Sequence, residues 1–323
     1  MDKRKLSNML LILTALIWGS AFVAQSIGME YIGPFTFGAA RSILGGVTLL
    51  PVVFFRKKKS QANKGKAEPD EKKEKNEQRK TLLAGGICCG ICLTIGSMAQ
   101  QIGLQYTTAG KGGFITALYI LIVPLLGLAF GRKAGKKVWC GVILAVVGMY
   151  FLCVKDGFSI SKGDWIILAG SFAFAGHILV IDYFSPKVDG VCLSCLQFFI
   201  CGMICAIPML VSEHQPTVNA VLVSWRPIVY AGVLSSGVGY TLQIIAQKNT
   251  DPTVASLLMS LESVFAVLAG WGILGERLSV REFVGCVLVF SAVILAQLPE
   301  SSQFRKSDSF RINCRVAEYD ANA

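Results

Sequence analysis

Charged residues are scarce in this sequence. Only 16% of its 323 residues are Asp, Glu, Lys or Arg, against about 25% in an ordinary soluble domain. Apolar residues make up 53% of the chain, and the mean hydropathy is +0.58. This balance argues against an ordinary soluble domain and indicates a protein that crosses a membrane several times.

Histidine is nearly absent, with two residues in the whole chain. An enzyme acting inside the membrane would need a nucleophile and base, or a metal group. His177 is the one histidine in an apolar segment, and no paired acids lie near it in the sequence. The sequence also lacks a Gly-Lys-Ser phosphate-binding loop, which argues against an ATP-driven protein.

The eleven cysteines do not indicate a metal site. Cys192-x2-Cys195 and Cys201-x3-Cys205 superficially resemble ligand pairs, but the same spacing follows one face of a helix. We expect these side chains to pack between helices, and we expect neither a metal nor a cofactor.

Basic charge is concentrated rather than spread over a surface. The net charge is +11, and 11 of the 31 Lys and Arg residues lie in 56–80. No basic groove with interleaved aromatic residues is visible, so we expect no binding to nucleic acid. The composition of 56–80 predicts a disordered loop.

Long apolar segments dominate the rest of the chain. A helix needs about 20 apolar residues to cross the bilayer, and ten segments approach that length. The first follows "MDKRK" and is too long for the apolar part of a signal peptide, so we expect it to be retained. The segments are 6–26, 35–55, 81–102, 108–130, 136–154, 164–184, 191–211, 227–247, 252–274 and 281–298.

The distribution of Lys and Arg predicts the orientation. With the N-terminus inside, the inner regions hold 24 of these residues and the outer loops hold 5. We therefore expect a multi-pass protein of the cytoplasmic membrane with both termini in the cytoplasm. The tails are 1–5 and 299–323.

An internal repeat relates the two halves. Residues 107–154 align with 251–298 at an offset of 144 positions without a gap. The pattern predicts two units of five helices, 6–154 and 164–298, and the odd number gives the units opposite orientations. Such inverted repeats are typical of secondary transporters, in which the substrate site lies between the repeats.

The sequence resembles the EamA family of the drug/metabolite transporter superfamily. The matching stretches are "LTALIWGSAFV", "GAARSILGG", "QQIGLQYTTAGKGGFITALYILIVPLLG" and "LESVFAVLAGWGILGERLS". The resemblance covers about 6–298 and implies ten transmembrane helices, as a 5+5 inverted repeat, around a central cavity. This sequence departs from the family pattern at Ser263, where Pro is usual, and at "GRKAG", where GERL is usual.

Glu262 is the most informative acid. It lies about ten residues into an expected helix, so about 15 Å deep at 1.5 Å per residue. On a helical wheel its face carries small residues, and the opposite, bulky face is the one that we expect to meet lipid. The bulky face consists of Leu257, Leu261, Val264, Leu268 and Trp271. An acid within a membrane is a functional candidate, and a neutral, hydrogen-bonded Glu262 joining helices is the alternative.

Two basic residues also lie within helices. Lys111, near the outer end of a helix, could attract a substrate carboxylate or extend to the interface. Arg41 could contact a substrate or form a fixed pair with a protein carboxylate, because a guanidinium keeps its charge.

The third helix of each unit carries a polar stripe at helical spacing. Together these stripes predict the walls of a wet cavity, or else hydrogen bonds between helices. Trp18, Tyr119 and His177 are further cavity candidates, with packing roles as the alternatives. The stripes are Thr94, Ser97, Gln101 and Gln105, and Ser236, Tyr240, Gln243 and Gln247.

The sequence therefore predicts a secondary transporter that exports a small polar metabolite, such as an amino acid, by alternating access. Its expected partners are a small-molecule substrate and the lipid bilayer, and proton coupling through Glu262 is a hypothesis. The alternatives are an exporter of lipophilic drugs and a membrane receptor or scaffold without transport. Gly86-x3-Gly90 and Gly127-x3-Gly131 permit either a homodimer or close packing within the chain.

Overall fold

The computed structural model describes residues 3–62, 69–107, 109–129, 131, 135–153, 160–213, 218–274 and 279–297. Within these ranges every regular element is a helix. The first half contains α1 (Lys3–Met29), α2 (Pro34–Ala62), α3 (Pro69–Gly103), α4 (Ala109–Ala117), α5 (Tyr119–Ala129) and α6 (Lys136–Cys153). The second half contains α7 (Lys162–Phe184), α8 (Gly190–Ser212), α9 (Val218–Val223), α10 (Trp225–Val229), η1 (Tyr230–Tyr240), α11 (Thr241–Gln247), α12 (Pro252–Met259), α13 (Leu261–Leu274) and α14 (Val280–Gln297).

The helices fit the predicted all-α membrane fold. In the described part of the chain, eight helical stretches are long and apolar enough to cross a bilayer. They coincide with eight of the ten predicted segments. α6 and α14 occupy the other two positions as helices of 18 residues each, and their crossing of the membrane stays a prediction.

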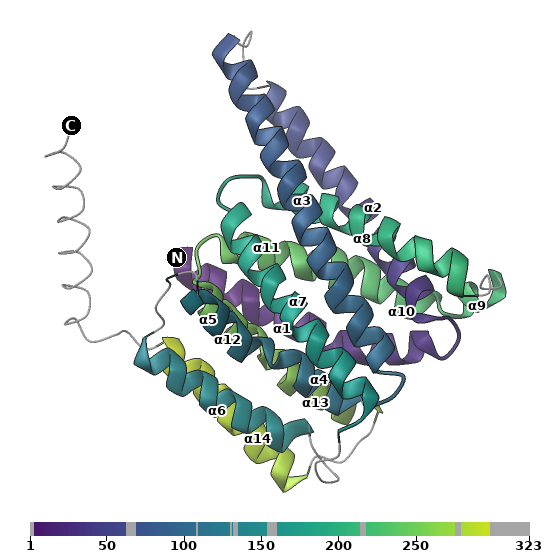
Figure 1. Ribbon diagram of the computed structural model, residues 1–323, viewed down its shortest axis with the longest axis vertical. Helices are drawn as coiled ribbons and strands as arrows, with labels where there is room; N and C mark the ends of the chain where they lie inside the picture. The colour runs from purple at the N-terminus through teal and green to yellow at the C-terminus, as the bar shows by residue number, and fades with distance from the viewer. Residues whose placement is uncertain are drawn as a thin grey trace, which may run out of the picture.

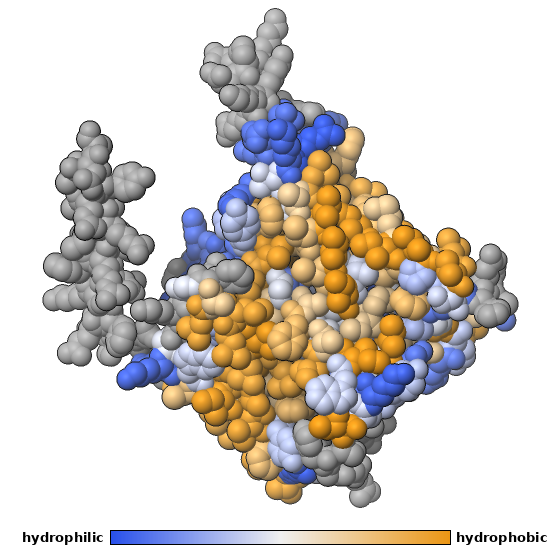
Figure 2. Space-filling model, in the orientation of Figure 1, coloured by the Kyte–Doolittle hydropathy of each residue, from blue (hydrophilic) through white to orange (hydrophobic). Residues whose placement is uncertain are grey.

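The surface agrees with a lipid environment. An apolar region covers much of the face seen in Figure 2, and polar residues gather where α2 and α3 project from the bundle. Large apolar side chains are exposed on several helices, including Ile95, Ile143, Ile207 and Ile294. Such an apolar exterior is costly in water, but it costs little where the neighbours are lipid chains.

The structure differs from the prediction of a disordered loop at 56–62 and 69–80, whereas 63–68 lie outside the described residues. α2 continues to Ala62 and α3 begins at Pro69, so both helices project beyond the rest of the bundle (Figure 1). Lys, Glu, Gln and Arg favour helices, and Lys80 pairs with Glu77 at 2.8 Å one turn away. These polar residues are therefore able to extend helices that begin in the apolar core.

Most of the extensive helix contacts join the two halves of the chain. The largest pairs are α6 with α14, α2 with α8, α3 with α7 and α1 with α13. In Figure 1, α6 and α14 lie side by side at one edge of the bundle. The two units are thus intertwined and share one core.

The α6–α14 contact has the symmetry that the repeat predicts. A Cβ on Gly141 would lie 3.1 Å from the carbonyl oxygen of Ala292, and a Cβ on Gly285 would lie 2.7 Å from that of Gly148. Gly141 and Gly148 correspond to Gly285 and Ala292 at the same offset of 144 positions. The pair therefore crosses at a point where equivalent residues exchange places.

The α2–α8 contact behaves in the same way. A Cβ on Gly46 would meet the ring of Phe199, and a Cβ on Gly202 would meet Ile43. Both contacts are related by an offset of 156 positions. By this offset Arg41 of α2 corresponds to Gln197 of α8.

The Gly86-x3-Gly90 motif is used within the chain. A Cβ on Gly86 would meet Leu196, and one on Gly90 would meet Ile200, both on α8. These glycines therefore allow α3 to approach α8 closely. Close packing within the chain therefore accounts for this motif. Formation of a homodimer stays a prediction.

Three of the apolar segments are interrupted near their centres. One helix divides into α4 and α5 at Leu118, and another divides into α12 and α13 at Ser260. The Ser260 hydroxyl donates to the carbonyl of Leu257 at 2.7 Å, a local bond that competes with regular helix geometry. The third segment contains η1, a wide π-helix of 11 residues.

The expected lipid face of the Glu262 helix is wrong in part. Leu257, Leu261 and Val264 are 1% exposed or less. α12 is enclosed by α1, α5, α6, α7 and α14, so both of its faces meet protein. The wheel correctly assigns exposure only further along α13, where Trp271 is 57% exposed.

Candidate functional site

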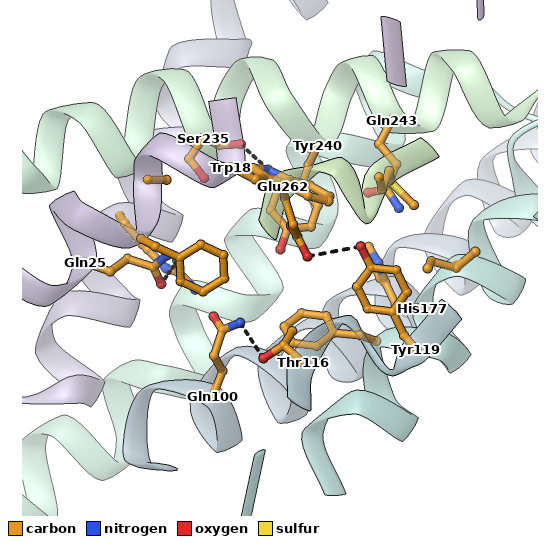
Figure 3. A pocket seen from close by; sticks show the side chains of 16 residues that line it. Trp18, Gln25, Gln100, Thr116, Tyr119, His177, Ser235, Tyr240, Gln243 and Glu262 are labelled. Carbon is orange, nitrogen blue, oxygen red and sulfur yellow. Dashed lines mark hydrogen bonds between the residues drawn. The ribbon is translucent and has the colours of Figure 1, made fainter. Parts of the chain in front are cut away.

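A cavity lined by polar, aromatic and aliphatic side chains lies within the bundle, beside the interrupted helices (Figure 3). It offers about 50 Å³ to the centres of water-sized molecules, which is enough for a few waters. Both halves of the chain contribute to its walls. The lining residues are Trp18, Ala21, Phe22, Gln25, Arg41, Gln100, Thr116, Tyr119, Phe174, His177, Ile178, Ser235, Tyr240, Gln243, Met259 and Glu262.

The structure brings seven of the nine predicted site residues to this cavity. They are Trp18, Arg41, Tyr119, His177, Tyr240, Gln243 and Glu262. Gln101 is fully buried behind the wall and bonds to the lining residue Gln25. The backbone of Lys111 lies in α4, and its side chain is outside the described part of the structure.

Glu262 lies in the first turn of α13 and is 4% exposed. The Tyr119 hydroxyl donates to its Oε1 atom at 3.1 Å from the other side of the cavity. A buried carboxyl needs such a donor because it has left water. The bond joins α5 to α13 and therefore couples one broken helix to the other.

The backbone of Glu262 is held by α1. A Cβ on Gly19 would lie 2.6 Å from the Glu262 carbonyl oxygen and 2.8 Å from the Ala266 nitrogen. Only a glycine allows α1 to approach α13 this closely. Gly19 therefore fixes the depth at which the carboxyl enters the cavity.

Arg41 lies in α2 and is 7% exposed. Its Nη1 donates to Gln25 Oε1 at 3.1 Å, and Gln101 Nε2 donates to the same oxygen at 3.0 Å. A guanidinium has five N–H donors, and no carboxylate pairs with Arg41 within the described ranges. The predicted fixed pair with a protein carboxylate is thus absent there, and donors remain to meet an anion in the cavity.

Aromatic rings form the opposite wall around Tyr240. The rings of Trp18, Phe198 and His177 lie 4.4, 5.5 and 5.9 Å from the Tyr240 ring, measured between centroids. Trp18 Nε1 donates to the Ser235 carbonyl of η1 at 3.4 Å. These contacts hold the rings against the π-helix, as Figure 3 shows for Trp18 and Tyr240.

His177 lines the cavity and also has the hydrogen-bond partner that the structural alternative expects. Its Nε2 lies 3.0 Å from Gln197 Oε1, and the ring is 1% exposed. Gln197 is the residue that corresponds to Arg41 in the repeat. The two halves therefore place unlike groups at equivalent positions, a guanidinium in one and an amide bonded to imidazole in the other.

Several lining residues were not predicted. Gln25 lies in an apolar stretch of α1, and a polar side chain in such a stretch could have identified it as a cavity residue. Gln100 donates to Thr116 Oγ1 at 3.1 Å, but it lies beside Gln101 in the sequence, off the predicted stripe. No group of three or more His, Cys, Asp or Glu in the described residues could hold a metal ion.

This architecture defines a polytopic helical membrane protein whose two halves together line a central cavity with buried polar groups. The EamA-like transporter family model matches residues 5–154 and 161–298. The chain therefore belongs to the EamA-like transporter family, which identifies it as a membrane transporter.

Two curated relatives extend this similarity. The chain is 29% identical over 297 residues to an uncharacterized transporter of Archaeoglobus fulgidus, covering 92% of this chain and 87% of the relative. It is 23% identical over 290 residues to the uncharacterized inner membrane transporter YedA of Escherichia coli K12, covering 88% of each. These names support a multi-pass protein of the cell membrane.

A solved structure shares the fold. A crystal structure with 16% sequence identity superposes with a TM-score of 0.73, covering 90% of this chain and 96% of the other. At this identity the likeness concerns the fold alone.

Proposed function

We propose that this protein is a secondary transporter that exports a small polar metabolite, such as an amino acid, by alternating access. The observation that carries this proposal is that Arg41 and Glu262 line the same cavity. Arg41 comes from the first unit and Glu262 from the second. A substrate with an anionic and a cationic end would be recognised by both units at once.

The arrangement assigns a role to each group. The free donors of Arg41 bind a substrate carboxylate, since guanidinium and carboxylate fit in a bidentate manner. Glu262 receives an amino group or a proton, and Tyr119 orients its carboxyl by the 3.1 Å hydrogen bond. Tyr240 offers an aromatic face between them, and the amides of Gln25, Gln100 and Gln243 accept or donate further hydrogen bonds.

The proposed orientation has both termini in the cytoplasm. The excess of Lys and Arg in the projecting ends of α2 and α3 supports it. The units 6–154 and 164–298 would then cross the membrane in opposite directions. Exchange of packing between them around the cavity is the motion that alternating access requires.

The first experiment identifies the substrate and tests the two charged groups. Comparison of metabolites in the medium of overexpressing and deleted cells selects candidates, which are then assayed by counterflow in proteoliposomes. Loss of one charge-assisted hydrogen bond in Arg41→Gln should weaken apparent affinity by about tenfold or more. Arg41→Lys keeps the charge but loses the planar guanidinium, so its apparent affinity should lie between those of the wild type and Arg41→Gln.

Glu262→Gln tests the proton. If Glu262 carries a proton, counterflow by the wild-type protein depends on pH and counterflow by Glu262→Gln does not. Undiminished exchange with wild-type pH dependence in the variant would refute the proton-carrier role. Other titratable or charged groups face this cavity as well, namely Tyr119, Tyr240, His177 and Arg41. Tyr119→Phe is the matched control, because it removes the hydrogen bond to Glu262 and leaves the carboxyl in place.

A lipophilic drug exporter is the second candidate. The rings of Trp18, Phe22, Phe174 and Tyr240 on the cavity wall favour it. It predicts that a deletion strain becomes sensitive to several unrelated apolar compounds, and that Arg41→Gln has no effect on this resistance. The metabolite exporter predicts the opposite on both points.

A further inference from the structure

Three buried polar residues continue from the cavity along α11. Gln243 lines the cavity, and Gln247 and Thr250 follow at intervals of four and three positions. Gln243 and Gln247 therefore share one face of α11, about 6 Å apart along its axis, and Thr250 lies in the turn that follows the helix. Their exposed fractions are 1%, 2% and 6%, so the column is closed along its length.

Each of the three carries an oxygen that is not satisfied. Gln243 Oε1, Gln247 Oε1 and Thr250 Oγ1 have no hydrogen-bond partner among the described residues. Gln247 Nε2 donates to the Ile178 carbonyl of α7 at 3.3 Å. Unsatisfied buried polar groups are costly, and they are rare unless water reaches them. Three such groups in succession, two on α11 and one in the turn after it, indicate a surface that is hydrated during part of the protein's cycle.

The first unit contains the same motif. "QIGLQ" at 101–105 corresponds to "QIIAQ" at 243–247, each at the end of the third helix of its unit. Gln101 is buried and bonded to Gln25, whereas Gln105 is exposed. The column that begins in α3 thus reaches the surface at Gln105, just beyond the end of that helix, and its counterpart in α11 is buried at Gln247.

The two columns lead to opposite faces of the molecule. Thr14 donates to the Gly239 carbonyl and Trp18 to the Ser235 carbonyl, so α1 runs antiparallel to η1 and α11. The end of α11 therefore lies at the face where α1 begins. Gln101 meets Gln25 near the other end of α1, so Gln105 lies at the far face.

We propose that the two glutamine columns line the two halves of the solute path, and that the Gln243–Gln247–Thr250 column is the closed half in this conformation. The column accommodates water and a small hydrogen-bonding solute, because its groups are neutral amides and a hydroxyl. This inference rests on the proposed alternating access. α7 closes the column through Ile178, and it contacts α11 sparsely while it packs along α3, so separation of α7 from α11 opens the path.

Cysteine accessibility tests this path without a known solute. Gln247→Cys, Thr250→Cys and Gln105→Cys are made in the full chain, and vesicles of each orientation are treated with a membrane-impermeant quaternary-ammonium methanethiosulfonate. Peptide mass spectrometry locates the modified cysteine among the native ones. Ala246→Cys and Ile244→Cys, both at fully buried positions of α11, are the matched controls.

We expect Gln247→Cys and Thr250→Cys to react from the face where α1 begins, and Gln105→Cys from the other face. Gln247→Cys should react roughly tenfold faster than Ala246→Cys, which corresponds to about 1.4 kcal/mol in opening free energy. Modification of Gln247→Cys no faster than Ala246→Cys, or from the same face as Gln105→Cys, would overturn the inference. Thr250→Cys replaces a hydroxyl by a thiol of similar size and serves if Gln247→Cys does not fold.

The labelling result separates this inference from the proposed function. Labelling requires no solute. If the cysteines in the two columns do not react, the proposed path is rejected, and metabolite export is still tested separately by counterflow. Side-specific labelling with no counterflow of any metabolite would keep the hydrated path and reject the export proposal.

Discussion

Gly19 sets the distance between α1 and α13, and this one residue tests the position of Glu262. A Cβ at Gly19 would lie 2.6 Å from both the Glu262 carbonyl oxygen and the Phe265 Cβ. Backbone cannot yield as a flexible side chain can, so Gly19→Ala should destabilise the protein by about 1–3 kcal/mol through overpacking. Thermal unfolding in detergent measures the effect.

Gly272→Ala is the control for Gly19→Ala. Gly272 also lies in a helix, and no atom lies within 4 Å of a Cβ built there. Alanine favours a helix over glycine by about 1 kcal/mol, so Gly272→Ala should be neutral or stabilising. Equal melting temperatures for the two variants would contradict the close α1–α13 contact.

At the same scale, the sequence predicted as cavity residues those polar side chains that are most costly to place in lipid. Glu262, Arg41 and Tyr240 stood out because an apolar segment tolerates few such groups. Gln25 and Gln100 were missed because an amide is less costly in a helix interface and gives a weaker signal. Burial of Leu257 depends on which helices surround α12, which a helical wheel of one segment does not contain.

At the scale of elements, α2 and α8 are joined at both ends by charged groups. Glu213, at the end of α8, accepts from the Phe35 and Thr36 backbone nitrogens at 2.8 Å and from the Thr36 hydroxyl. A carboxylate at a helix N-terminus satisfies free N–H groups and the helix dipole. Glu213→Ala should therefore lower the free energy of unfolding by about 1–2 kcal/mol.

The control for Glu213→Ala is Glu77→Ala, which removes an exposed pair with Lys80. Exposed pairs contribute about 0–1 kcal/mol. Unfolding by denaturant in detergent should separate the two variants clearly. If the Glu213→Ala protein is as stable as the Glu77→Ala protein, the cap of α2 does not contribute to the free energy of unfolding.

The other end of the α2–α8 pair gives a pH prediction. Asp189 caps α8 through the Val191 and Cys192 nitrogens and pairs with Arg56 at 2.8 Å. Burial raises the pKa of Asp189, but the hydrogen bond from the Cys192 backbone and the contact with Arg56 outweigh it, so the pKa lies below 3.8. The stabilisation is present above the ordinary carboxyl value and is lost as pH falls through the folded pKa.

Asp189→Asn should therefore flatten the acid side of the stability profile. Melting temperatures in detergent between about pH 3 and pH 6 bracket the ordinary carboxyl pKa. The effect is small, since both side chains are about half exposed and water screens the pair. A wild-type acid slope that persists unchanged in the variant would contradict the role of Asp189.

The breaks within elements were not predictable from single segments. The apolar runs predicted continuous helices over 108–130 and 252–274, whereas the structure interrupts them at Leu118 and Ser260. Hydropathy gives the length of a helix but not its regularity. The π-helix η1 likewise depends on its neighbour, because α1 side chains bond to its Ser235 and Gly239 carbonyls.

At the scale of the whole molecule, the two units should not fold separately. The principal helix pairs, such as α6–α14 and α2–α8, join one unit to the other. Residues 1–159 and 160–323 expressed as two chains should each be degraded alone and recovered as a 1:1 complex when expressed together. Affinity purification through a tag on one chain measures this, and a stable single half would contradict the shared core.

The repeat was visible in the sequence because residues 107–154 and 251–298 keep their register. The intertwining was not visible, since a repeat fixes the similarity of two units and not which helix packs on which. Contacts across the units, such as Gly141 with Ala292, join residues about half the chain apart. Only the assembled structure shows that these contacts, rather than those within a unit, form most of the core.

The shared core has a consequence for biogenesis. α1 leaves the ribosome long before α13, and at 5–20 residues per second the interval is on the order of ten to fifty seconds. During that time Gly19 has no partner, and Arg41 lies in an incomplete bundle without Glu262 or Tyr240. The membrane insertion machinery must therefore shelter the first unit until the second is synthesised, and release of the protein into lipid waits for the last helices of the chain.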